Sequence, residues 1–426
     1  MNAIAGLKQR FKRIRHGSEY EELYTALDIG TEYVKALVVR REGRNGIVLG
    51  VSRQRQTFAD MEGGVPADIP GIIASCDRAL SEAEDMCETV PGRAVIGIAG
   101  EQVKGFSTSV TVPRPDPALK INEWELQQTL QAVEKRAFRE ARHVMSQELG
   151  VPDVEVKLIN SAITGVRIDG FPVRNPLEFQ GKQMLITVFN TFAPLTHIGA
   201  LQTIAAELDL DLMAAVAEPY AMARCAASDE IYDAGGVFID IGGGTTDVAL
   251  VRNGGIEGTR MFPIGGRVFT KKLAMRLNRS YGEAEALKIR HARGDLTPAE
   301  EERVHAILSP DADVLVQGVA ITLEQLARGD RLPPAIYLAG GGSALPEVRL
   351  QLESFPWTRA LPFARMPAVT VLRPADVLGI YDATGLLLDQ QDITPMGLAY
   401  HAIQQGGGEE GPMYGVMRKV LKAMRV

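Results

Sequence analysis

The chain has 426 residues, of which 46% are hydrophobic and 23% charged, as in soluble globular proteins large enough for about three domains. Its formal net charge of −7 provides no overall positive field, so nucleic acid is not expected as a partner. Three cysteines without a CxxC spacing indicate neither a disulfide framework nor a zinc site, and they fit a reducing cytoplasm. No apolar run reaches the roughly 18 residues that predict a membrane-spanning helix.

The first 21 residues form a basic arm before the first predicted strand. Apolar residues in this arm are spaced three and four apart and alternate with lysines and arginines. These apolar residues are Ile4, Leu7, Phe11 and Ile14. The pattern is compatible with an amphipathic helix on a membrane, and also with an arm that is disordered or docked on its own protein.

Residues 24–40 (YTALDIGTEYVKALVVR) predict a strand, a tight turn and a second strand. The same pattern recurs in residues 235–251 (GGVFIDIGGGTTDVALV). Both segments place an Asp at the end of a strand, then Ile-Gly, then a return strand. Two copies of one unit predict two similar α/β domains that face each other.

Strand and helix signals alternate along the rest of the chain. The expected strands cover much of residues 94–112 and 154–190, together with residues 212–217. The expected helices are residues 121–148, 194–209 and 219–228, and most of 268–307. Residues 335–343 predict a strand that ends in AGGGS and leads into a helix. Residues 404–412 (QQGGGEEGP) predict a flexible linker before the last residues.

The segment from Asp240 to Asp247 (DIGGGTTD) has the features of a loop that binds a metal and a triphosphate. Glycines lack a Cβ, so the backbone can turn tightly and approach a ligand, while successive amides form an anion-binding concavity. Thr245 adds a hydroxyl donor. The two carboxylates would repel a phosphate unless Mg²⁺ lay between them. Taken alone, the segment is also compatible with an ordinary glycine-rich hairpin.

Three further segments carry related features. Asp28, Gly30, Thr31 and Glu32 lie in the turn of the first strand pair. Gly340, Gly341 and Gly342 precede a predicted helix start, where free amides and the helix dipole favour polar ligands. Glu218 stands before a Pro that suits the first turn of a helix. No GxxxxGK[ST] segment is present, so a Walker-type ATPase is not expected.

Two Asp-containing hairpins, a connecting helix and a glycine-rich loop, in this order, resemble the actin-like ATPase superfamily. The segments VRIDGFPVRNPLEFQGKQMLITVFNTF and AEALKIRHARGDL further resemble the bacterial cell division protein FtsA. The resemblance covers about residues 22–402 and the tail. It implies an α/β, actin-like two-lobed ATPase fold of duplicated ribonuclease-H-like domains, with an inserted domain called 1C.

The resemblance also implies ATP and Mg²⁺ as cofactors and gives each motif a role. Asp28 and Asp240 would organise the metal and its waters, and Asp247 would act nearby through a metal-bound water. Glu218 would orient the attacking water, so Glu218 and Asp240 are the catalytic candidates. The residues that would cradle the phosphates are Gly30, Thr31, Gly242, Gly243, Gly244 and Thr245, and Glu32 is a further expected cofactor-binding residue.

The adenosine part of the nucleotide would lie between a helix and the third glycine loop. Glu285 and Lys288, spaced i and i+3, share one helix face and resemble the pair that holds the ribose. The alternative for this pair is a solvated ion pair on the surface. Gly340, Gly341 and Gly342 would line the adenine.

The resemblance implies a domain order in which subdomains 1A and 2A are each built from separate segments of the chain. The expected segments are a basic arm (1–21), subdomain 1A (22–93, 179–234 and 376–403), the inserted 1C domain (94–178), subdomain 2A (235–267 and 308–375), subdomain 2B (268–307), a flexible linker (404–412) and an amphipathic membrane-targeting helix (413–426).

The tail MYGVMRKVLKAMRV predicts a short amphipathic helix that lies in a bilayer interface. Its apolar stripe is Met413, Val416, Met417, Val420, Leu421 and Met424, and its basic residues are Arg418, Lys419, Lys422 and Arg425. Each basic residue near an anionic surface contributes about 1 kcal/mol, so one tail binds weakly and a polymer of many tails binds by avidity. A helix packed on its own domain is the alternative.

The resemblance to FtsA implies an ATP-binding cytoskeletal protein that forms filaments and tethers a ring of the tubulin homologue FtsZ to the membrane. Such a protein is cytoplasmic and peripheral on the inner face of the cell membrane, and it uses ATP mainly as a conformational switch with slow hydrolysis. The region of subdomain 2B, which holds the FtsZ peptide in FtsA proteins, is shorter here. The alternatives are a PilM-type adaptor of a type IV pilus and, less favoured, a sugar or acid kinase.

Overall fold

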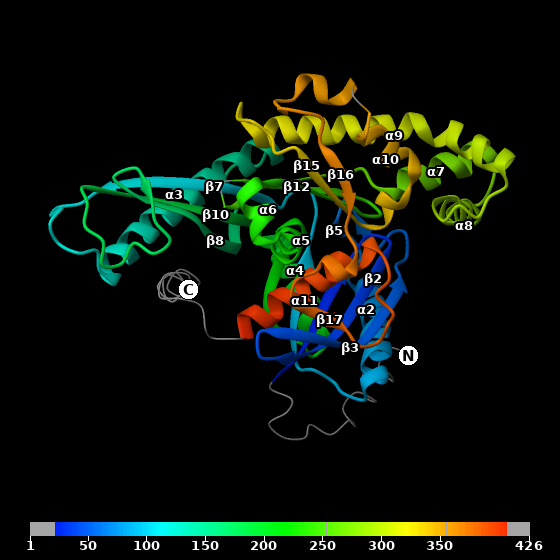
Figure 1. Cartoon of the computed structure of the whole chain (residues 1–426). Helices are drawn as coiled ribbons and strands as arrows, with labels where there is room; N and C mark the ends of the chain where they lie inside the picture. The colour runs from blue at the N-terminus through cyan, green and yellow to red at the C-terminus, as the bar shows by residue number, and fades with distance from the viewer. Residues whose placement is uncertain (1–21, 253, 355, 407–426) are drawn as a thin grey trace.

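A computed structural model of the protein describes residues 22–252, 254–354 and 356–406 (Figure 1). Two large mixed sheets and their helices form two lobes, and a third unit projects from one side of them. The N-terminal arm, the tail of residues 413–426 and most of the expected linker lie outside the described residues. The first residues of that linker, 404–406, instead complete the last turn of helix α11 (Ile393–Gly406).

The first lobe contains a six-stranded sheet with the order β11-β6-β1-β2-β3-β17. Its strands are β1 (Leu23–Ile29), β2 (Tyr33–Glu42), β3 (Asn45–Arg55), β6 (Arg93–Ile98), β11 (Asp211–Ala217) and β17 (Ile380–Asp382). β1 is buried along its whole length and pairs antiparallel with β2 through a turn in which the Gly30 amide donates to the Tyr33 carbonyl. This confirms the strand, turn and strand expected for residues 24–40.

Helices cover both faces of the first sheet. The helices of this region are α2 (Ile69–Cys87), α4 (Leu195–Glu207), α5 (Glu218–Ala226), α6 (Asp229–Ala234) and α11, and a small hairpin joins β4 (Met61–Glu62) to β5 (Val65–Pro66). α2 packs on β2 and β3, while α11 packs on β1, β6 and α5. α5 also contacts β12, β13 and β14 of the second sheet, so α5 joins the cores of the two lobes (Figure 1).

The second lobe contains five strands of a nine-stranded sheet with the order β16-β15-β12-β13-β14-β7-β10-β8-β9. These strands are β12 (Gly236–Ile241), β13 (Thr246–Arg252), β14 (Gly255–Phe262), β15 (Ala335–Ala339) and β16 (Ala368–Val371). The helices are α7 (Gly266–Leu277), α8 (Tyr281–Ala292), α9 (Pro298–Ala327) and α10 (Pro346–Leu352), and they enclose a separate core. β12 pairs antiparallel with β13 and parallel with β15, as β1 does with β2 and β6, which confirms the internal repeat.

Helix α9 extends well beyond residue 307, where the helical signal was expected to end. Pro310 lies inside it, although proline usually ends a helix because it lacks an amide and crowds the preceding turn. Burial of one side of the helix, including Leu308, Leu315 and Val319, compensates for this cost. By length and composition α9 is the one helix among the described residues that could cross a membrane. Its buried side instead packs in the second lobe.

The projecting unit, here called the insert, contains β7 (Lys104–Pro113), α3 (Glu123–Leu149), β8 (Val156–Ile168), β9 (Phe171–Pro172) and β10 (Gln183–Pro194). β6 pairs with β1 and therefore belongs to the first lobe, whereas β10 pairs along its length with β7 and β8. Sheet pairing thus sets the limits of the insert at Lys104 and Pro194 rather than at residues 94 and 178. The physical reason is that a strand belongs to the sheet that satisfies its backbone hydrogen bonds.

The insert is joined to both lobes. Its chain connections run to β6 and α4 of the first lobe, while β7 pairs with β14 of the second lobe at Gly105 and Phe106. A Cβ at Gly105 would lie 2.0 Å from the Thr259 Oγ1, so glycine permits this junction. The Glu148 carboxylate at the end of α3 also lies 2.5 Å from the Lys104 Nζ and 3.6 Å from an Arg260 nitrogen. The nine-stranded sheet therefore continues from the second lobe into the insert.

The insert carries a buried carboxylate that makes its stability depend on pH. Glu134 on α3 is 1% exposed, and neither of its carboxylate oxygens has a hydrogen-bond partner among the described residues. Burial raises the pKa of Glu134 from 4.5 to about 7. Between pH 4.5 and about 7, the folded protein holds a proton on Glu134 that the unfolded chain has released. The free energy of unfolding therefore falls as the pH rises through this range.

Replacing Glu134 with Gln should remove the cost of burying an ionised carboxylate at high pH. We expect Glu134→Gln to raise the free energy of unfolding at pH 8 by about 1–3 kcal/mol, because a neutral amide costs less to bury than a carboxylate, and to give little gain at pH 5. Thermal unfolding at the two pH values measures the difference. Glu140→Gln is the control, because Glu140 lies on the same helix and is hydrogen-bonded by Thr108. An equal gain at both pH values would contradict the claim that Glu134 causes the pH dependence of stability.

Candidate functional site

A cavity of about 460 Å³ lies between the two lobes, within the size range of small-molecule sites. It is lined by the β1–β2 turn, the β12–β13 turn, α8, the loop after β15 and the start of α11. The fold therefore brings the separate motifs of the sequence into one place. The predicted residues that line it are Asp28, Gly30, Thr31, Glu32, Glu218, Asp240, Gly242, Gly243, Thr245, Asp247, Glu285, Lys288, Gly340, Gly341 and Gly342.

Four buried carboxylates meet in this cavity. Asp28 ends β1, Asp240 and Asp247 flank the β12–β13 turn, and Glu218 begins α5; none is more than 8% exposed. The Lys35 Nζ on β2 lies 2.9 Å from the Asp28 Oδ2. The Glu218 Oε1 and the Asp247 Oδ1 are buried and have no hydrogen-bond partner among the described residues. The cluster thus has more negative charge than the structure neutralises.

The pKa values of the cluster follow from this excess of negative charge. Burial, followed by repulsion from the neighbouring carboxylates, raises the pKa of Glu218 and of Asp247 well above their usual range. Burial also raises the pKa of Asp240, although a hydrogen bond from Thr394 opposes the shift. Burial alone would lower the pKa of Lys35, but the charge and hydrogen bond of Asp28 outweigh it and raise that pKa. A proton or a cation would therefore stabilise the cluster.

The arrangement fits a divalent cation that keeps part of its water shell. Among the described residues, no three His, Cys, Asp or Glu side chains have the spacing of a complete metal cage. Mg²⁺ is usually held by one or two carboxylates, waters and phosphate oxygens, so it does not need such a cage. The unpaired oxygens of Glu218 and Asp247 are the observation that supports this fit.

The β1–β2 and β12–β13 turns pack against each other across the cleft. A Cβ at Gly243 would lie 2.8 Å from the Glu32 Cβ, and a Cβ at Gly244 would lie 2.7 Å from the Thr31 Cγ2. These two glycines therefore allow the lobes to approach closely, whatever the cavity binds. Gly244 is the predicted phosphate-binding residue that does not line the cavity. The close contact with Thr31 explains why a residue without a Cβ stands at position 244.

Glu285 and Lys288 form a buried pair in the cavity wall. Their side chains are 9% and 13% exposed, and the Lys288 Nζ lies 2.8 Å from the Glu285 Oε2. Lys288 also donates to the Thr270 Oγ1 at 2.8 Å and to the Gly266 carbonyl at 3.1 Å. The alternative of a solvated surface pair is therefore wrong.

The third glycine loop contacts both lobes. The Gly340 amide donates to the Gln390 carbonyl of the first lobe at 2.9 Å. Gly340 has a φ of +78°, and a Cβ there would lie 2.0 Å from the Asp240 Oδ1. A Cβ at Gly342 would lie 2.4 Å from the Ile241 Cγ2. Glycine at both positions lets the loop pack against the end of β12.

Sequence reasoning missed two residues of the cluster. Thr394, at the start of α11, donates to the Asp240 Oδ2 but is distant in sequence and belongs to no local motif. Lys35 could have been noticed, because it is a charged residue among the apolar residues of β2. Glu32 does line the cavity as expected, but its carboxylate also binds Arg55 and Arg267.

Duplicated strand-turn-strand units that face a shared cleft are the architecture of actin-like ATPases. The solved PilM–PilN type IV pilus biogenesis complex is similar to this chain with a TM-score of 0.63 and 18% identity, over 91% of this chain and 99% of that chain. MreB5 of Spiroplasma citri bound to AMPPNP has a TM-score of 0.48 and 13% identity, over 90% and 97% of the two chains. The actin-like ATPase fold predicted from the sequence is confirmed.

Sequence comparisons point to one group within this class. The family model described as Cell division protein FtsA matches residues 237–377. Cell division protein FtsA of Pseudomonas aeruginosa is 26% identical over 349 residues, which are 76% of this chain and 78% of the relative. That of Neisseria meningitidis is 28% identical over 278 residues, 64% of this chain and 62% of the relative. The predicted resemblance to FtsA is confirmed over these matched parts of the chain.

The contacts of the third glycine loop give a direct mutational prediction. Gly340→Ala would force a Cβ toward Asp240 at a positive φ, so we expect the free energy of unfolding to fall by about 2–4 kcal/mol. Gly341→Ala is the matched control, because the atom nearest to its Cβ would be 4.0 Å away, and it should change stability by less than about 0.5 kcal/mol. Urea unfolding without nucleotide measures both variants. Equal stability of the two would show that the packing of Gly340 is unimportant.

Proposed function

We propose that this protein is an FtsA-like, ATP-binding cytoskeletal protein that forms filaments and tethers an FtsZ-like tubulin homologue to the cytoplasmic face of the membrane. The observation that carries the nucleotide part is the buried cavity in which the two Asp-containing turns converge beside unpaired carboxylate oxygens. The actin-like fold and the matches to FtsA support the cell division part.

Different residues of the cavity would bind the metal and the phosphates of Mg-ATP. Asp28 and Asp240 would hold the metal through its waters, and Asp247 would accept a hydrogen bond from one of them. Bound Mg²⁺ supplies positive charge that offsets the carboxylates and the phosphates. Lys35, which lines the cavity and is bonded to Asp28, would bind a phosphate oxygen. The phosphates would lie against the turns at Gly30 and at Gly242 to Thr245.

The other end of the nucleotide would lie in the second lobe. Glu285 would accept hydrogen bonds from the ribose hydroxyls, and Lys288, which is bonded to Glu285, Thr270 and Gly266, would hold that carboxylate in position. Gly340, Gly341 and Gly342 would lie against the adenine.

Hydrolysis in this site would be slow. Glu218 would orient an attacking water, with Asp240 in the same cavity. Burial and the neighbouring carboxylates raise the pKa of Glu218, so a larger share of it carries a proton than of an ordinary glutamate, and the protonated form cannot take a proton from the water. Nucleotide would therefore serve mainly to set the conformation of the two lobes.

Membrane attachment and partners rest on parts of the chain beyond the described residues and on the relation to FtsA. The apolar stripe of the tail, from Met413 to Met424, would lie in the bilayer surface, with Arg418, Lys419 and Lys422 toward anionic lipid. The helices α7 and α8 and the start of α9 correspond to the region expected to hold an FtsZ peptide. The PilM-type alternative gains no specific support, because the likeness to PilM–PilN is one of fold alone.

Electron microscopy on an anionic lipid monolayer tests the scaffold directly. With Mg-ATP we expect ordered rows of filaments, because each protomer contributes one weak tail and the polymer binds by avidity. A chain truncated after Glu410 should polymerise in solution but lose liposome binding at least about tenfold. Dispersed single molecules under conditions where ATP binds would contradict the filament proposal. Undiminished binding of the truncated chain would place the membrane contact in residues 1–21.

A further inference from the structure

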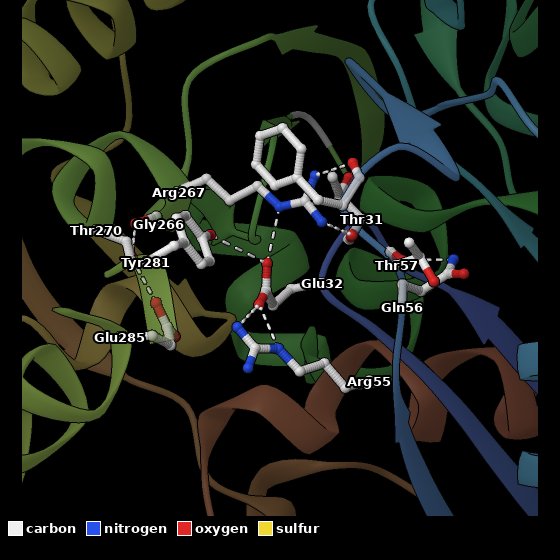
Figure 2. A network of polar contacts seen from close by, with 12 residues as sticks. Thr31, Glu32, Arg55, Gln56, Thr57, Gly266, Arg267, Thr270, Tyr281 and Glu285 are labelled. Atoms are coloured by element: carbon white, nitrogen blue, oxygen red, sulfur yellow. Dashed lines mark hydrogen bonds and ion pairs between the residues drawn. The ribbon is translucent and has the colours of Figure 1, made fainter. Parts of the chain in front are cut away.

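A set of contacts joins the two lobes beside the cavity (Figure 2). The Arg267 Nε on α7 donates to the Glu32 Oε2 at 2.8 Å. The same guanidinium donates to the Thr31 carbonyl and, at 3.3 Å, to the Phe58 carbonyl. Arg267 belongs to the second lobe and all three acceptors belong to the first, so opening of the cleft must break these bonds.

Aromatic contacts between the lobes lie beside these hydrogen bonds. The Phe58 ring centroid lies 4.7 Å from the Arg267 Cζ and 5.6 Å from the Tyr281 ring centroid in an edge-on arrangement. The Tyr281 hydroxyl donates to the Glu32 Oε2 at 3.4 Å. Glu32, Phe58, Arg267 and Tyr281 are here called the clasp. Phe58 and Glu32 come from the first lobe, and Arg267 and Tyr281 come from the second.

The clasp extends from the cavity to the solvent. The Glu32 side chain lines the cavity, and Arg267 is 8% exposed. Phe58, at the outer end, is 51% exposed. The other side of the cavity is bounded by different contacts between the lobes, from Thr394 to Asp240 and from Gly340 to Gln390. The cavity therefore lies between two sets of contacts that join the lobes.

Arg267 is distinct from the second cation that binds Glu32. Arg55 on β3 donates to the Glu32 Oε1 at 3.0 Å, but Arg55 and Glu32 both belong to the first lobe (Figure 2). Loss of Arg267 would leave Glu32 paired with Arg55, so the carboxylate would not become an isolated buried charge. Loss of Arg267 therefore weakens the connection between the lobes more than it weakens either lobe.

We propose that Arg267 is a positioning residue that gates nucleotide exchange by holding the Thr31–Glu32 turn of the first lobe against the second lobe. The inference rests on the proposed nucleotide binding and assigns a regulation to that site. The clasp holds the two lobes together beside the cavity, so we expect it to open both for entry and for exit of the nucleotide. Removal of Arg267 therefore accelerates both steps and changes the equilibrium affinity less than either rate.

Stopped-flow kinetics of a fluorescent ATP analogue with Mg²⁺ tests this gate. We expect Arg267→Met to raise the association and dissociation rate constants about 10-fold or more, with Kd changed less than about threefold. Arg55→Met removes a bond within the first lobe and, across the cleft, only the contact of its guanidinium with the Tyr281 ring at 5.9 Å, so it should change both rates less than about threefold. Lys272→Met is the matched control on α7, because Lys272 pairs with Asp311 at 3.2 Å within the second lobe.

Each other outcome has a defined meaning. A faster dissociation with unchanged association would make Arg267 an ordinary binding contributor and overturn the gate. An equal effect of Arg55→Met would show that Arg267 has no special part in joining the lobes and would overturn the gate. If Arg267→Met does not fold, Phe58→Leu replaces it, because half-exposed Phe58 contributes less to folding, and unchanged rates in that variant overturn the gate. No analogue binding to the wild-type chain would overturn the proposed nucleotide function itself.

Discussion

Mutual repulsion among four buried carboxylates is the constraint on which the centre of this structure depends. Asp28, Glu218, Asp240 and Asp247 come from both lobes and meet in one cavity, where burial raises the pKa of the last three. Such a cluster costs stability unless protons, a lysine or a bound cation offset it. Lys35 pairs with Asp28, and the buried Glu218 Oε1 and Asp247 Oδ1 have no hydrogen-bond partner among the described residues. Binding of a cation with its phosphates would therefore stabilise the closed arrangement of the lobes.

The rest of the fold brings these charges together and holds them there. Gly243 and Gly244 let the two turns touch, and Gly340 lets the third loop reach Asp240. The Thr394 and Gln390 contacts join the lobes on one side of the cavity, and the Arg267 clasp joins them on the other. The insert is attached by chain connections to the first lobe and by strand pairing to the second. A change in the separation of the lobes would therefore act on the insert as well.

The sequence predicted those parts of the site that lie in local motifs. Asp28 and Asp240 were found because each ends a strand in a repeated strand-turn-strand unit, and the structure places both in the cavity. Thr394 and Arg267 were not found, because their partners are remote in sequence and their own surroundings carry no motif. β10 was assigned to the first lobe because a strand signal does not specify its partner. Helix α9 continues past residue 307 because its packing in the second lobe tolerates Pro310 within the helix, which the local sequence does not reveal.

Isothermal titration calorimetry of ATP, with and without Mg²⁺, tests the central claim that the carboxylate cluster holds a metal-nucleotide. We predict Mg²⁺-dependent binding that falls at least about tenfold in Asp247→Asn, because the amide loses the charge that attracts the metal and its waters. Asp153→Asn is the control, since the Asp153 side chain is 93% exposed and far from the cavity lining. ATP binding that is equally strong without Mg²⁺ and unchanged in Asp247→Asn would contradict the account.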